Sequence, residues 1–297
     1  MACGALAMQA AGIEIEKYIA YEVDKYAIQT AQHNFPFIEE RGDVFKADFT
    51  EYAGFDYLIG GSPCTYWSIA QTKNRETVAS GMGWELFSQY VRALHEAKPR
   101  FFLYENNKSM SAAIRASITE TFGFEPILIN SALVSAQNRQ RLYWCGIRQA
   151  DGTYKKAEIQ QPADRGILLK DILETSITWL DKSHTIDATY YKGSSLNGEK
   201  MHQNFLRIMA AEPLKTESID APIYEVKDGF ITVKGNKYPI KLVDGFYIIR
   251  KLTVRECMRL QTVPEWYEWP VSKSQAYKML GNGWTVEVIA HLLRGLK

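Results

Sequence analysis

The 297-residue sequence is poor in the residues that build cross-linked, metal-bound or membrane-embedded proteins. Its four cysteines and five histidines lie far apart and lack the short spacing of zinc ligands, so we expect reduced thiols and no metal. No run of about 18 apolar residues occurs, and the N-terminus lacks the basic-then-apolar pattern of an export signal. These absences predict a cytoplasmic protein without a membrane span. The formal net charge of +1 neither favours nor excludes nucleic acid, because a local basic groove can coexist with a neutral total.

What the sequence does contain is a regular alternation of β-type runs and helical patterns over its first 150 residues, which is typical of a parallel sheet covered by helices. Apolar residues recur at helical spacing in residues 24–35 and 84–97. The expected strands span 17–23, 55–61, 99–106 and 141–148. We therefore expect an α/β fold in this half of the chain.

The pattern changes between about residues 160 and 250. Turn-forming pairs at Asp228-Gly229, Gly235-Asn236 and Asp244-Gly245 separate short β-type runs, which predicts a meander of β-hairpins. Helices are expected after it, at 253–263, at 274–280 and in the segment that follows residue 281. The expected units are an α/β domain at 1–160, a β-rich domain at 161–270, and a C-terminal helix at 271–297 that returns to the first domain.

Two potentially reactive residues directly follow predicted strands. Cys64 comes after the apolar run "FDYLI" in "GGSPCTYWS", and Glu105 follows "FFLY". In open α/β sheets, ligands bind outside the carboxyl ends of the strands, so both residues should face one crevice. A thiol beside an acid suits nucleophilic attack on an electron-poor ring, in which the protonated acid stabilises charge on a ring nitrogen. A lone cysteine is more commonly an inert core thiol, but Gly, Ser and Pro around Cys64 favour a shaped loop.

Several motifs carry a family resemblance. In this order and at this spacing, "GGSPCTYWS", "LYENN" and "QNRQRLYWCGI" resemble the cytosine-5 DNA methyltransferases, especially the short bacterial and phage type. The similarity extends to "YEVDKYA", "GDVFKADF", "RKLTVRECMRLQTVPEW" and "LGNGWTVEVIAHL", so that it runs from about residue 2 to residue 294 with only the middle domain left out. It implies a Rossmann-like, S-adenosylmethionine-dependent methyltransferase sheet with a smaller β-rich target-recognition domain.

The resemblance implies a catalytic set. Cys64 would attack carbon 6 of cytosine, which makes carbon 5 able to accept the methyl group of S-adenosylmethionine. Glu105 would hold ring nitrogen 3 and the exocyclic amine and neutralise developing charge. Arg139 and Arg141 of "QNRQR" would lower the pKa of the thiol and orient the carbonyl oxygen of the base. Arginines at this spacing also fit a solvated strand end, but their alternation places both on one strand face, which favours a role in the site.

A second set would bind the cofactor. An acidic residue about 20 positions after a glycine loop commonly binds ribose hydroxyls, and Glu22 follows Gly4 at about this spacing. By resemblance, Asp43 and Val44 would contact the adenine. The expected cofactor-binding residues are Gly4, Glu22, Val23, Asp43, Val44, Pro63, Asn282 and Trp284.

The chain also departs from the family pattern. The family begins with a strand that leads into a glycine-rich loop, whereas this sequence opens at "MACGALAMQAAGIE", already inside that loop. We expect the first strand to be encoded upstream of Met1; the alternative is a truncated, inactive protein. Thr65 replaces a common Gln, and "ENN" replaces the commoner "ENV". Gly283 and Trp284 stand where Ser and Val are frequent, and Trp284 and Val23 would exchange aromatic character around the adenine.

Substrate and partners follow from the same reasoning. A carbon inside a stacked duplex is unreachable, so the cytosine must flip out of double-stranded DNA. Residues 151–250 carry 14 Lys or Arg and 14 Asp or Glu, so DNA affinity there must come from arrangement. The lysines expected to grip phosphate, or merely to protect strand edges, are Lys227, Lys234, Lys237 and Lys241. We expect a monomer, and a cognate restriction endonuclease is left open as a partner. Alternatives are an RNA cytosine methyltransferase of the same family and a catalytically impaired DNA-binding relative.

Overall fold

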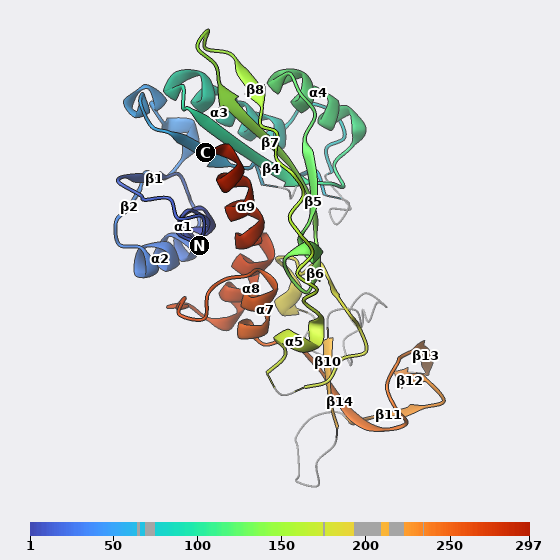
Figure 1. Cartoon of the computed structure of the whole chain (residues 1–297). Helices are drawn as coiled ribbons and strands as arrows, with labels where there is room; N and C mark the ends of the chain where they lie inside the picture. Colours follow the sequence, from blue (N-terminus) through green and yellow to red (C-terminus); the bar gives the residue numbers. More distant parts are fainter. Residues whose placement is uncertain (64–65, 69–74, 175, 193–208, 214–222, 234) are drawn as a thin grey trace.

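The computed structural model describes residues 1–63, 66–68, 75–174, 176–192, 209–213, 223–233 and 235–297. Its main sheet has the strand order β3–β4–β7–β5, with β8 paired to β7 (Figure 1). These strands span Tyr57–Gly60 (β3), Phe101–Asn107 (β4), Ile127–Asn130 (β5), Gln140–Arg148 (β7) and Tyr154–Lys156 (β8). Strands β3 and β4 are parallel, but β7 runs antiparallel to both β4 and β5. The expectation of a wholly parallel sheet is therefore wrong: residues 131–139 are too few for the crossover that parallel strands need.

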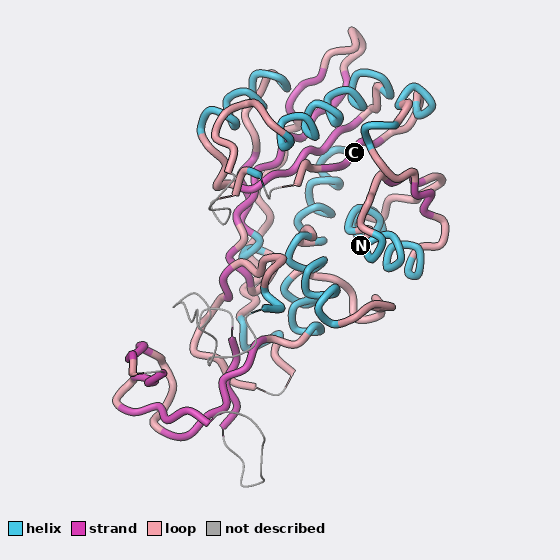
Figure 2. Tube along the Cα trace, turned by 180° about the vertical axis from the view of Figure 1, so that it is seen from behind, coloured by secondary structure: helices cyan, strands magenta, loops and turns pink. Residues whose placement is uncertain are grey.

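Helices cover both faces of this sheet because its strands alternate between two apolar sets (Figure 2). Phe102 and Tyr104 of β4 pack with α3 (Met82–Ala97) and α4 (Ala112–Phe122). Phe101 and Leu103 belong to the cluster on the other face, which includes α1 (Cys3–Ala10) and α9 (Val286–Leu296). The first and last helices of the chain thus pack together under the sheet.

A separate two-stranded parallel sheet holds β1 (Tyr18–Ala20) and β2 (Ile38–Glu40), joined by α2 (Lys25–Asn34). Among the residues that the structure describes, no strand connects β1 to β3, and the two sheets lie apart in Figure 1. Gly4 of α1 lies between them. A Cβ atom at this position would fall 2.4 Å from both the Tyr18 hydroxyl and the Ile59 Cδ1 atom, so the helix approaches β1 and β3 closely.

The β-rich segment forms a second, antiparallel sheet of order β10–β14–β11–β12–β13. Its strands are Met209–Pro213 (β10), Ile223–Lys227 (β11), Phe230–Val233 (β12), Asn236–Pro239 (β13) and Gly245–Lys251 (β14). Two of the three predicted turns have the expected backbone: Asp228 and Gly229 take positive φ angles of 52° and 76°, and Gly235 has φ of 79°, whereas Gly245 of the third pair already begins β14. The α/β fold with a smaller β-rich unit is thereby confirmed. The domain boundaries at 160 and 270 stay a prediction.

Short elements connect the two sheets. Strand β6 (Gln137–Asn138) pairs in parallel with β9 (Ser183–His184), and α5 (Leu169–Ile172), α7 (Val254–Leu260) and α8 (Lys273–Asn282) complete the set. The helices predicted at 253–263 and 274–280 are confirmed as α7 and α8. Within the described ranges, no helix is long and apolar enough to cross a membrane, and no group of three or more His, Cys, Asp or Glu residues could hold a metal.

A charged cluster joins the second sheet to α7. Arg250 of β14 contacts Glu256 of α7 at 2.8 Å and Glu212 of β10 at 2.7 Å. Glu256 is fully buried, and its carboxylate also accepts main-chain N–H groups of Thr253 and Glu174. Burial raises the pKa of Glu256, but the hydrogen bonds from Arg250 and the main chain outweigh it, so this pKa lies below its ordinary value of 4.5.

This cluster predicts an acid-sensitive stability. A carboxyl whose folded pKa is lowered contributes stability above its unfolded pKa, and the contribution is lost as the pH falls below about 4.5. We expect Glu256→Gln to weaken this acid dependence and to lower the free energy of unfolding at neutral pH by about 3 kcal/mol, because it breaks a buried ion pair. Urea unfolding on both sides of pH 4.5 measures both effects.

The matched control is Glu125→Gln, which removes an exposed partner of Arg115 and should cost less than about 1 kcal/mol. If the free energy of unfolding fell equally with acid in Glu256→Gln and in the wild type, the cluster would not be the source of the acid sensitivity.

Candidate active site

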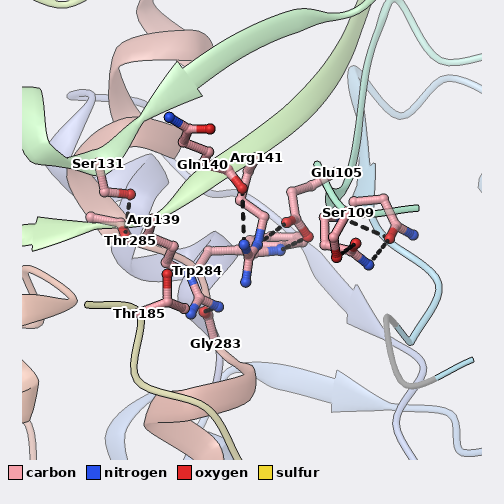
Figure 3. A network of polar contacts seen from close by, with 12 residues as sticks. Glu105, Ser109, Ser131, Arg139, Gln140, Arg141, Thr185, Gly283, Trp284 and Thr285 are labelled. Carbon is pink, nitrogen blue, oxygen red and sulfur yellow. Dashed lines mark hydrogen bonds and ion pairs between the residues drawn. The ribbon is translucent and has the colours of Figure 1, made fainter. Parts of the chain in front are cut away.

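The acidic residue predicted for catalysis lies where the sheet brings several elements together. Glu105 of β4 forms an ion pair with Arg141 of β7, with 3.1 Å between Oε1 and Nε. Its other oxygen, Oε2, accepts a hydrogen bond of 2.9 Å from the indole Nε1 of Trp284 (Figure 3). The side chains of Glu105 and Arg141 are only 12% and 14% exposed, so the ion pair is largely shielded from water. The structure thus brings together three predicted residues from three distant parts of the chain.

The loop that leads to the predicted nucleophile starts beside this carboxyl. Gly60 pairs with Tyr104, and a Cβ atom at Gly61 would fall 2.5 Å from the main-chain oxygen of Glu105. The Ser62 hydroxyl bonds the Tyr104 hydroxyl at 2.6 Å, and the Asn106 amide donates to the Ser62 carbonyl. Cys64 itself, with Thr65, lies outside the described residues. The exposed Pro63 is the last described residue before it.

The far side of this loop is also tied down. Trp67 is fully buried, and its indole donates to the Glu76 carboxylate at 2.9 Å. The guanidinium of Arg75 donates to the carbonyls of Trp67 and Ser109. The segments on both sides of the loop are therefore held to the sheet and to the turn after β4.

Arg139 has contacts of a different kind from those of Arg141. It lies between β6 and β7 and is 3% exposed. Its guanidinium donates to the main-chain carbonyls of Ile186, Gly281 and Gly283 at 2.9 to 3.1 Å. These bonds hold the turn between α8 and α9. The structure therefore gives Arg139 a support role beside its predicted catalytic one, which stays a prediction.

The turn between α8 and α9 is fixed by further polar contacts. The Gln261 amide donates to the carbonyls of Leu280 and Gly283, and the Thr285 hydroxyl bonds both Gln261 and Ser131. A Cβ atom at Gly281 would fall 2.1 to 2.4 Å from the backbone of residues 187–188, so only glycine fits there. Trp284 therefore reaches Glu105 from a rigid turn. The sequence patterns did not predict this contact between Trp284 and Glu105.

The other three cysteines are buried and form no disulfide among the residues that the structure describes. Burial raises the pKa of the Cys3, Cys145 and Cys257 thiols. A thiol with a raised pKa is a poor nucleophile because little thiolate forms near neutral pH. Cys64 is therefore the remaining candidate for nucleophilic chemistry.

Comparison with known proteins identifies the family. The model of the C-5 cytosine-specific DNA methylases matches residues 2–297. The chain belongs to this family. It is 28% identical over 291 residues to the Type II methyltransferase M1.ScrFI of Lactococcus lactis subsp. cremoris, covering 93% of this chain and 70% of that protein. It is also 28% identical to M.NlaX of Neisseria lactamica over 290 residues, covering 93% and 87%.

A solved structure has the same fold. The structure of a variant of Spodoptera frugiperda DNMT2 matches with a TM-score of 0.64 at 17% identity and covers 99% of this chain and 96% of that one. As a C-5 cytosine-specific DNA methylase, the protein is an enzyme that transfers the methyl group of S-adenosylmethionine to cytosine in DNA.

Four of the residues predicted to bind the cofactor of this methylase follow the carboxyl ends of β1 and β2, whereas Pro63, Asn282 and Trp284 lie on other elements. Glu22 is half-buried, and its Oε1 accepts the main-chain N–H groups of Val23 and Asp24. Asp43 follows β2 and accepts the N–H of Phe45, and Val44 begins a short 3-10 helix. Val23 is 73% exposed. Their cofactor roles remain predictions.

Gly4 differs from its expected setting. The sequence pattern places it in a glycine loop, but it lies in the first turn of α1, since the Ala-rich run "ACGALAMQAA" has high helix propensity. Asn282, at the end of α8, is exposed.

One buried atom bears on whether these residues fit S-adenosylmethionine. Glu40, at the end of β2, has a buried Oε2 without a hydrogen-bond partner among the described residues, and burial raises its pKa. It lies within electrostatic range of Glu22 and of the N-terminal ammonium. The carboxylates of Glu22 and Glu40 suit the hydroxyl and amino groups of the cofactor. Among the residues that the structure describes, no side chain caps the start of α1, so its free main-chain N–H groups suit the negatively charged carboxylate of the cofactor. The residues present therefore fit the cofactor.

The contacts of Arg139 give a test of its support role. Arg139→Met should lower the free energy of unfolding by about 3 kcal/mol, because it leaves buried carbonyls without a donor. Arg115→Met, on an exposed ion pair, should cost less than about 1 kcal/mol. Denaturant unfolding measures both. Equal, small losses in the two variants would remove the support role and leave only the catalytic prediction.

Proposed function

We propose that this methylase modifies a flipped-out cytosine in duplex DNA through a covalent adduct with Cys64. One observation carries the proposal: the Glu105 carboxyl is held between Arg141 and Trp284, directly beside the glycines that lead to Cys64. Within this arrangement an acid and a thiol can act on opposite sides of one ring. The family membership supplies the reaction, and the described geometry supports the roles.

The Cys64 thiolate adds to carbon 6 of cytosine, and the protonated Glu105 carboxyl donates its proton toward ring nitrogen 3, where negative charge develops. Carbon 5 becomes enamine-like and forms a bond to the methyl group. S-adenosylmethionine would supply that methyl group from a positively charged sulfur, and the methyl–sulfur bond would break to leave a neutral thioether. Loss of the proton from carbon 5 and departure of the thiolate restore the aromatic ring and the free enzyme.

Arg141 assists at the same point. Its guanidinium fixes one oxygen of Glu105 and leaves donors for the carbonyl oxygen of the base. The ion pair is mostly shielded from water, which strengthens each electrostatic contact in the site. Arg139 supports this arrangement from behind through the turn that carries Trp284.

The second sheet is proposed to recognise the DNA. Lys227 and Lys237 are exposed on β11 and β13, where they can reach phosphate. Lys241 is exposed beyond β13 and lines a shallow pocket of about 230 Å³ together with Lys170. Lys234 lies outside the described residues. Flipping the base costs a few kcal/mol, which contacts of this kind offset.

We propose three further properties of the protein: its location, a partner and its oligomeric state. DNA as substrate favours a cytoplasmic location in a bacterial or phage-infected cell. The names of M1.ScrFI and M.NlaX as Type II methyltransferases favour a restriction endonuclease with the same recognition sequence as a partner. The site is assembled within one chain, which favours a monomer. Sedimentation of the purified protein and a search of the locus for an endonuclease gene test the last two.

The covalent step predicts the effect of removing the thiol. Cys64→Ala should abolish methyl transfer to duplex DNA, and wild type should form a covalent complex with an oligonucleotide that carries 5-fluorocytosine, because fluorine cannot leave as the proton does. Transfer of labelled methyl and gel electrophoresis measure the two effects. Cys145→Ala, which removes a buried thiol, is the control and should retain activity.

Two other outcomes would point elsewhere. Methylation of transfer RNA but not of duplex DNA would identify an RNA methyltransferase of the family. Retardation of DNA without methyl transfer by the wild type would identify a catalytically impaired relative. Bisulfite sequencing of DNA from expressing cells would locate the target sequence.

A further inference from the structure

Trp284 donates a hydrogen bond to the carboxyl oxygen of Glu105 that Arg141 does not contact. Arg141 Nε contacts Oε1 at 3.1 Å, whereas the Trp284 indole donates to Oε2 at 2.9 Å. Each carboxyl oxygen therefore has its own donor, from a different element. Figure 3 shows the two side chains reaching Glu105 from β7 and from the turn before α9. A carboxyl held at both oxygens cannot rotate about its terminal bond.

The indole is held in place by its backbone. The carbonyl of Gly283 accepts from Arg139 and Gln261, and the Thr285 hydroxyl bonds Ser131 and Gln261. Residue 284 is thus fixed on both sides. Because the ring nitrogen of tryptophan is a donor only, this contact can serve the carboxylate without competing for a proton.

The space around Oε2 is also limited. A Cβ atom at Gly61 would fall 3.3 Å from Oε2 and 2.5 Å from the main-chain oxygen of the same residue. Gly61 and the indole of Trp284 therefore enclose Oε2 on two sides. What remains accessible of Glu105 is a small part of the side chain, 12% of its surface.

We propose that Trp284 is a positioning residue for the reaction, which sets the plane of the Glu105 carboxyl toward the cytosine ring, and that its main role is not in cofactor binding. This inference rests on the proposed function. The direction of the carboxyl decides whether its proton can be donated to ring nitrogen 3, and small errors in such directions reduce rates strongly. Resemblance to the family predicted that Trp284 lies at the adenine of the cofactor. Its hydrogen bond to Glu105 instead directs the indole N–H toward the site proposed for the target cytosine.

Trp284→Phe separates the two roles, because it keeps an aromatic ring and removes only the N–H donor. We expect kcat for DNA methylation to fall about tenfold or more, the loss typical of a hydrogen bond to a charged group, while KM for S-adenosylmethionine changes by less than about twofold. Trp266→Phe makes the same substitution at an exposed site and should leave both constants unchanged. Steady-state kinetics with labelled methyl donor measure them.

A second measurement tests the contact without relying on activity. In protein labelled with nitrogen-15 at tryptophan, the Trp284 indole resonance is identified by its loss in Trp284→Phe. It should shift in Glu105→Gln, because the amide is a weaker acceptor than a carboxylate. The Trp266 resonance should stay in place.

The outcomes separate the two proposals. If wild type methylates DNA and Trp284→Phe retains full kcat, the positioning role is wrong. If the variant loses affinity for the cofactor and keeps kcat, Trp284 is a cofactor contact instead. An indole resonance that ignores Glu105→Gln would disprove the hydrogen bond. Absence of activity in the wild type would refute the proposed function, and the resonance experiment would still decide the contact.

Discussion

A buried positive charge on Arg139 organises the site. Transfer of a guanidinium from water into a protein interior is expensive unless its donors find acceptors, and here the carbonyls of Ile186, Gly281 and Gly283 supply them. Meeting that demand fixes the turn between α8 and α9. This turn fixes the position of Trp284, whose indole N–H donates to one oxygen of Glu105. The orientation of the acid therefore depends on Arg139 as well as on Arg141, its ion-pair partner.

Much of the fold was predictable because it depends on periodicity. The strands β3, β4 and β7 and the helices α2 and α3 follow the apolar patterns that predicted them, and positive φ angles at Asp228, Gly229 and Gly235 fit the predicted turns. The direction of β7 could not be read from its pattern, because inward and outward alternation is the same in parallel and antiparallel strands. Strand β10 lies between segments outside the described residues, and its sequence "MAAEP" lacks the alternation of apolar and polar residues that predicts a strand.

The sequence predicted which residues belong to the site but not the contacts that these residues make. Strand ends indicated Glu105, and spacing brought in Arg141, yet their 3.1 Å ion pair depends on strand register, which one sequence does not fix. The contacts of Arg139 with Gly281 and Gly283, and of Trp284 with Glu105, join residues more than 100 positions apart. The second Asn of "ENN" was a usable signal: the buried Asn106 and Asn107 form a polar network with Tyr104 and Ser109 behind the loop.

The packing of α1 against α9 has a consequence for synthesis in the cell. Arg294 donates to the carbonyl of Ala10 and Lys297 to that of Gly12, so the final residues close the end of the first helix. During translation, α1 leaves the ribosome long before the helix that covers its apolar side. That surface stays uncovered while residues 11–285 are made, and contacts of such long sequence separation form slowly. Until α9 has been made, the apolar side of α1 is therefore a surface that chaperones of nascent chains can shield.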